Sequence, residues 1–172
     1  MATRKKVETE NTEVIFESGA VENASPPQKI NFDEKITIRS IAPWQVGWNK
    51  LETRGEINLV PYGSLRITRA EFIAGYENGN KLICGEGDGI HATVYTDDEA
   101  VRNYLGIEAP ILNKAYIGEI FKVKDYNEFE QKIKDTFTTV SEKQLLVKTM
   151  QELHIEDNNK VMICKLACGL EI

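Results

Sequence analysis

The sequence predicts an α+β fold, in which a mostly antiparallel sheet with short helices is followed by a helical C-terminal part. Apolar residues alternate with period two in residues 36–41 and 56–60, which indicates half-buried strands. In residues 125–172, apolar residues recur at helical spacings after helix-start signals. At 172 residues, the chain is long enough to bury a core without disulfides or metals.

Composition divides the chain into three zones. Residues 1–35 hold 5 basic and 7 acidic residues, two adjacent prolines and few large apolar side chains, so we expect an extended N-terminal arm. Its one apolar set, which is expected to dock on a neighbouring protein, is Val14, Ile15 and Phe16. Residues 36–124 are predicted to form a β-rich core domain, and residues 125–172 a helical segment packed on it.

The strand signals are short apolar or alternating runs bounded by turn residues. Residues 42–48 are expected to form a turn and bulge-like stretch after the first strand, and residues 85–89 (GEGDG) a hairpin loop. Two acids in this glycine-rich loop argue against phosphate binding, and two are few for calcium. Strands are expected at residues 36–41, 56–60, 64–67, 81–84, 90–95 and 117–123.

Helix starts are indicated by residues whose side chains can accept hydrogen bonds from free backbone amides. Three capping boxes are predicted, at residues 68–71, 96–99 and 141–144. Asp125 and Asp157, or its neighbour Asn158, are expected to cap two further helices. The helices after residues 68 and 96 should end at Asn78–Gly79 and Gly106.

Charge and hydropathy exclude several classes of protein. The net charge is −6 and the isoelectric point is near 5.1, so nucleic acid is unlikely as the main partner. No apolar run is long enough to cross a bilayer, and the basic start leads into a Glu-rich stretch without a visible signal peptide. We therefore expect no membrane partner.

Catalytic signals are weak. His91 and the nearby acid Asp97 are the one pair that suggests a general base with a helper, which defines a small enzyme as an alternative function. Structural roles are favoured, because acids at residues 97–99 suit a helix N-terminus. Cys84, Cys164 and Cys168 are expected to be buried free thiols. We therefore expect no enzyme activity, no cofactor and no metal.

Trp44 and Trp48, with Tyr62, form the main aromatic cluster of the sequence. Basic neighbours suggest base stacking, but Glu52 and Glu56 are interleaved with them. A role in the core or in a protein–protein interface is therefore favoured, since tryptophan is enriched at interface hot spots. Trp44 and Trp48 are accordingly predicted as partner-binding residues.

Within residues 36–106, the segments 41–48 (IAPWQVGW), 63–71 (GSLRITRAE) and 91–95 (HATVY) follow one another in this order. Together they resemble small structural proteins of tailed bacteriophages. This resemblance implies a virion component, made in the host cytoplasm and associated with the capsid or the head–tail region. It also implies that the protein acts through contacts with other virion proteins or with copies of itself.

The expected function is therefore that of a non-enzymatic virion structural or assembly protein. An extended arm suits this role, because a flexible segment can bury much surface on a neighbour. Two alternatives stay open: a phage-encoded intracellular protein that binds and inhibits a host factor, and a small enzyme centred on His91 and Asp97.

Overall fold

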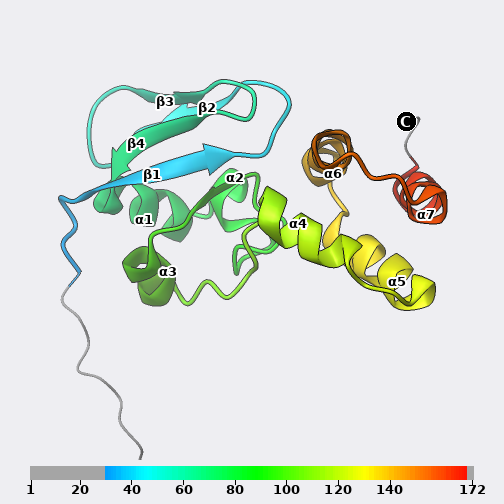
Figure 1. Cartoon of the computed structure of the whole chain (residues 1–172). Helices are drawn as coiled ribbons and strands as arrows, with labels where there is room; N and C mark the ends of the chain where they lie inside the picture. Colours follow the sequence, from blue (N-terminus) through cyan, green and yellow to red (C-terminus); the bar gives the residue numbers. More distant parts are fainter. Residues whose placement is uncertain (1–29, 170–172) are drawn as a thin grey trace, which may run out of the picture.

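The computed structural model describes residues 30–169, and Val14, Ile15 and Phe16 of the predicted arm lie outside this range. The described residues form an α+β fold with antiparallel sheets, short helices and a helical C-terminal part, which confirms the predicted fold class (Figure 1). The strands are β1 (Lys35–Ser40), β2 (Val46–Asn49), β3 (Glu56–Leu59), β4 (Ser64–Thr68) and β5 (Val94–Thr96). The helices are α1 (Arg69–Glu77), α2 (Lys81–Cys84), α3 (Glu99–Leu105), α4 (Lys114–Phe121), α5 (Tyr126–Thr136), α6 (Val140–Leu153) and α7 (Asn158–Cys168).

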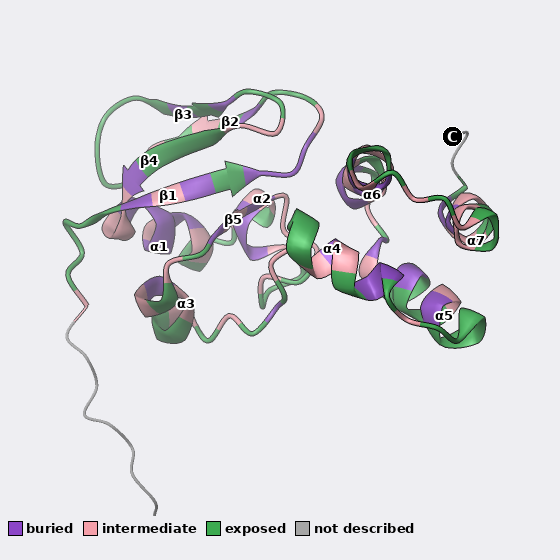
Figure 2. Ribbon diagram, in the orientation of Figure 1, coloured by how far each residue is buried: buried purple, intermediate pink, exposed green. Residues whose placement is uncertain are grey.

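Two small sheets contribute side chains to the first apolar core. In one, β1 lies between β4 and β5 and is antiparallel to both; in the other, β2 pairs with β3. Burial alternates along β1, where Ile36 and Ile38 point inward as the period-two pattern predicts (Figure 2). The inward side chains of the strands pack on Phe72 and Ile73 of α1 and on Val101 of α3. Helices α1 and α3 therefore cover one face of the β4–β1–β5 sheet.

The hairpin predicted from residues 81–84 and 90–95 is wrong. Residues 81–84 form helix α2, which starts where the Asn80 side chain accepts a hydrogen bond from the Leu82 N–H at 3.1 Å. The following turn has positive φ at Gly85, Gly87, Gly89 and His91, and it leads the chain back toward β1. Only Val94–Thr96 is extended, and it pairs with β1 instead. A short apolar run does not distinguish a buried strand from a buried helix.

The strand predicted at residues 117–123 is also wrong, because this segment lies within and just after helix α4. Asn113 caps the helix by accepting a hydrogen bond from the Tyr116 N–H at 2.9 Å. Ile117, Ile120 and Phe121 are buried, and their spacing of three and four residues matches one face of a helix. Conversely, part of the turn predicted at residues 42–48 is strand β2.

Three capping predictions are corrected by the structure. Thr68 caps α1, but Glu71 does not return a bond to it; the Glu71 carboxylate is buried and accepts hydrogen bonds from the Leu51 and Glu52 N–H groups. Asp98, rather than Thr96, caps α3. The capping box of α6 is formed by Thr139 and Glu142 instead of residues 141–144. The predicted caps Asp125 and Asp157 are confirmed.

Helices α4 to α7 enclose a second apolar core. Its fully buried side chains come from all four helices and the loop after α5: Ile117, Phe129, Ile133, Phe137, Leu146 and Cys164. Helix α4 thus packs with the C-terminal helices, although it precedes the domain boundary predicted at residue 125. Within residues 30–169, no helix is both long and apolar enough to cross a membrane.

Arg69 joins the first helices to the segment before β1. Its guanidinium binds Asp98 at 2.8 and 3.0 Å and Glu34 at 2.5 Å, and the Arg69 side chain is 11% exposed. Burial by itself would raise the pKa of Asp98, but hydrogen bonds from Arg69 and from the Val101 N–H lower this pKa below its usual value. The ionised form of Asp98 therefore stabilises the folded state.

We expect Arg69→Met to remove part of the acid dependence of stability. A carboxyl with a lowered folded-state pKa stabilises the fold above its unfolded pKa of about 4, and this contribution is lost as pH falls through the lowered pKa. Urea unfolding between neutral pH and pH 2.5 should show a shallower loss in the variant than in the wild type. Arg39→Met is the matched control, because Arg39 and Asp97 form an exposed pair at 3.5 Å. Equal pH profiles for Arg69→Met and Arg39→Met would contradict this reading.

Candidate functional site

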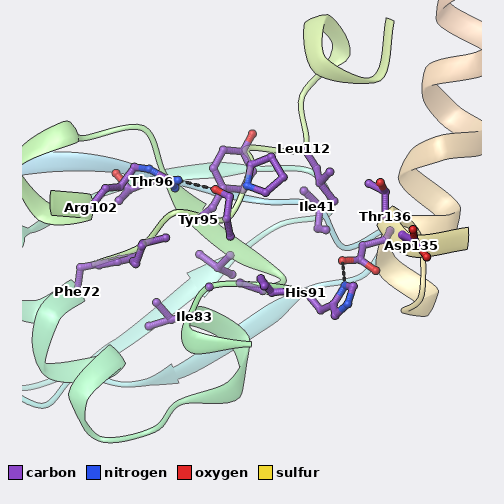
Figure 3. A pocket seen from close by; sticks show the side chains of 18 residues that line it. Ile41, Phe72, Ile83, His91, Tyr95, Thr96, Arg102, Leu112, Asp135 and Thr136 are labelled. Carbon is purple, nitrogen blue, oxygen red and sulfur yellow. Dashed lines mark hydrogen bonds and ion pairs between the residues drawn. The ribbon is translucent and has the colours of Figure 1, made fainter. Parts of the chain in front are cut away.

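A cavity of about 240 Å³ lies where the first core meets α5 and the start of α6 (Figure 3). Its lining is mostly apolar and comes from the end of β1, from α1, α2 and β5, and from the segment that links α3 to α4. The main apolar side chains are Ile41, Phe72, Ile83, Val94, Ile107 and Leu112. The cavity is therefore built by segments that are far apart in the sequence.

One side of the cavity carries the pair formed by His91 and Glu142. His91 Nδ1 lies 2.8 Å from Glu142 Oε1, and Glu142 is 1% exposed. The other oxygen of Glu142 accepts hydrogen bonds from the Thr138 and Thr139 N–H groups at 2.9 and 2.8 Å. Oε1 of Glu142 thus contacts the turn that carries His91, whereas Oε2 caps the start of α6. We call the His91–Glu142 pair the tether, because it links the turn before β5, beside the first core, to the start of α6, beside the second core.

The two residues proposed for an enzyme have different partners. His91 contacts Glu142 and lines the cavity, whereas Asp97 pairs with Arg39 at 3.5 Å, where both side chains are about half exposed. Asp97 is not among the described residues that line the cavity. His91 also lies in a turn with φ of 60°, and not on the strand expected from the sequence. The geometry therefore gives His91 a structural partner and does not pair it with Asp97.

Arg102 lies on the side of the cavity opposite His91 (Figure 3). Its Nη2 atom donates a hydrogen bond to the Ala109 carbonyl at 2.5 Å. Among residues 30–169, no carboxylate lies within 4.0 Å of its guanidinium nitrogens. Sequence reasoning missed both Arg102 and Glu142, because each appears in the sequence as an ordinary charged residue of an amphipathic helix.

The two tryptophans of the predicted aromatic cluster differ in how far they are exposed. Trp44 is 46% exposed, whereas Trp48 is half-buried against the first core. The register pairs Val46 with Leu59, which brings Trp44 and the 65% exposed Val60 to the same end of the hairpin. We call Trp44 and Val60 the hairpin-end patch. Trp48 therefore packs in part on the first core, whereas Trp44 is exposed within the described part of the chain.

The cysteines do not form a metal site in the part of the chain described. Cys84, Cys164 and Cys168 are buried free thiols, as expected. Burial raises the pKa of Cys164 to about 12, with a smaller contribution from Cys168, so this thiol is protonated at neutral pH. Within residues 30–169, no group of three or more histidine, cysteine, aspartate or glutamate side chains is arranged to hold a metal ion.

Comparisons of the chain with protein-family models, with curated proteins and with solved structures each gave no significant match. The resemblance of residues 36–106 to bacteriophage structural proteins therefore stays a prediction.

Proposed function

We propose that this chain is a non-enzymatic protein that acts through protein–protein contacts, as a structural or assembly component of a bacteriophage particle. Its partners are other virion proteins, and it reaches the virion after synthesis in the host cytoplasm. The bacteriophage setting is supported by the resemblance of residues 36–106, and the contact function by the hairpin-end patch.

The proposed contact function is supported mainly by the exposure of the hairpin-end patch. Trp44 and Val60 are large apolar side chains that are 46% and 65% exposed at one end of a two-stranded sheet. Tryptophan is among the residue types most enriched at interface hot spots, so an exposed tryptophan such as Trp44 suits a contact with a partner. Trp48, on the same hairpin, packs on the first core and thereby anchors the strand next to Trp44. The patch thus presents an aromatic side chain on an ordered support.

The arm provides the second proposed contact. Val14, Ile15 and Phe16 are its only cluster of large apolar residues, and they lie outside the described range. An apolar set of this kind on an otherwise polar segment suits docking on a neighbouring subunit. The chain would then contact its neighbours through two separate regions.

The test is whether the protein is incorporated into particles. Particles from a lysate that expresses the full chain are purified on a density gradient, and the copy number of the chain relative to the major capsid protein is measured by mass spectrometry. We expect a constant copy number for the wild type. Trp44→Ala should weaken the contact by about 30-fold, as for a hot spot of about 2 kcal/mol, and should deplete the chain from particles.

Tyr104→Ala is the matched control, because Tyr104 is an exposed aromatic residue outside the patch. It should leave incorporation unchanged, and both variants should melt like the wild type. A wild-type chain that stays in the soluble fraction and is absent from particles contradicts the virion assignment. Salt-sensitive binding of one host protein at fixed stoichiometry would instead support the inhibitor alternative.

A further inference from the structure

We propose that the cavity beside Arg102 binds a small carboxylic acid with an apolar body, such as an aromatic or branched-chain carboxylate. This site is separate from the hairpin-end patch and does not depend on the proposed contact function. The size of the cavity, the chemistry of its walls and the position of its charged groups all fit such a ligand.

The volume fits a molecule with one ring or a short branched chain. An apolar cavity of about 150 Å³ accommodates benzene, so about 240 Å³ leaves room for about ten non-hydrogen atoms. Pockets for larger ligands usually exceed about 300 Å³. The cavity is therefore too large to be an ordinary packing defect and too small for a nucleotide or a peptide.

The walls favour an apolar body. Ile41, Phe72, Ile83 and Val94 are each less than 5% exposed and form much of the inner wall. Ile107 and Leu112, from the segment that links α3 to α4, are half-buried and complete the apolar lining. Burial of a hydrocarbon group against these side chains releases water from apolar surface, which favours binding.

The charged groups place the carboxylate at Arg102. The Arg102 guanidinium has five N–H donors, of which one bond, to the Ala109 carbonyl, is present. No carboxylate among residues 30–169 lies within ion-pair distance of it, although the residue is half-buried beside an apolar cavity. The opposite side carries Glu142 and Asp135, which repel an anion. A ligand carboxylate at Arg102 would supply the missing counter-charge through charge-assisted hydrogen bonds.

The probe pair is benzoate and benzamide, which have nearly the same shape and differ in charge. Binding to the full chain is measured by titration of ¹H–¹⁵N NMR spectra, which also report the fold of each variant. We expect benzoate to cause saturable shifts at residues of the cavity and to bind more tightly than benzamide. Arg102→Gln removes the charge and keeps a polar side chain at this position. It should weaken benzoate binding by about tenfold to a hundredfold, as for a hydrogen bond to a charged group.

Two matched controls separate the site from general effects. Arg39→Gln removes the same charge from an exposed arginine outside the cavity, and it should leave benzoate binding unchanged. Leu112→Trp fills the cavity and should abolish binding of both probes, whereas Leu51→Trp, in an exposed loop, should not.

The proposal is overturned if benzoate causes no saturable shifts at the cavity. It is also overturned if benzamide binds as tightly as benzoate, or if Arg102→Gln and Arg39→Gln bind benzoate equally. Equal binding by Leu112→Trp and Leu51→Trp would place the ligand elsewhere and would overturn it as well.

Discussion

Glu142→Ala should lower the free energy of unfolding by about 1–3 kcal/mol, the range expected when hydrogen-bond donors lose a buried acceptor. The Glu142 carboxylate is 1% exposed and is bound by His91 Nδ1 and by the Thr138 and Thr139 N–H groups. Its removal leaves two backbone amides at the start of α6 without their acceptor, and it leaves His91 Nδ1 with Thr138 Oγ1, at 3.1 Å, in place of the carboxylate. Both changes act on the junction between the two cores.

Chemical denaturation followed by far-ultraviolet circular dichroism measures this change. Glu152→Ala is the matched control, because Glu152 lies on the same helix and pairs with Lys114 and Lys148 at the surface. This control should leave stability nearly unchanged, since exposed ion pairs contribute little. Equal effects of the two substitutions would show that the tether does not stabilise the fold.

Phe129→Ala should destabilise the second core by about 3–5 kcal/mol, as expected for removal of a fully buried aromatic ring. Phe129 is 0% exposed, its ring centroid lies 5.2 Å from that of Phe121, and Lys160 Nζ lies 5.4 Å from the Phe129 centroid. The substitution therefore removes contacts with both α4 and α7. Lys132→Ala on the same helix is the control and should melt nearly like the wild type, because Lys132 makes only a surface ion pair with Glu128.

Two probes follow the two cores separately in this experiment. Both tryptophans, Trp44 and Trp48, belong to the β2–β3 region of the first core, whereas much of the helical signal comes from α4 to α7. Because the cavity walls and the tether join the cores, we expect the fluorescence and circular dichroism transitions of Phe129→Ala to shift together. A shift of the circular dichroism transition alone would show that the cores unfold independently.

The elements that could be predicted are those whose signals are local. The alternation of Ile36 and Ile38 marks β1, and the caps Asp125 and Asp157 mark the starts of α5 and α7, because each feature involves residues close together in the chain. The four residues of helix α2 are too few to show a periodicity, whereas α4 has a helical spacing from Ile117 that the strand prediction did not use. Their state depends on the caps Asn80 and Asn113 and on what covers their apolar sides.

In the candidate sites, too, local signals were predictable and contacts between distant segments were not. Trp44 was predicted as a contact residue from its type, and its exposure is compatible with that role, but only the fold separates it from the half-buried Trp48. His91 was considered with Asp97, which is six positions away, whereas its partner in the structure is Glu142, 51 positions away. Nothing in the local sequence around either residue indicates that pairing.

The sequence by itself determined the α+β class, the positions of most helices and strands and the acidic balance of the chain. These follow from hydrophobic periodicity, turn residues and capping side chains, which act over a few residues. Only the tertiary structure decided that His91 meets Glu142, that Arg102 lies beside an apolar cavity and that Trp44 points outward. Such contacts depend on how separate segments pack against one another, because burial and pairing are properties of the assembled core rather than of any one segment.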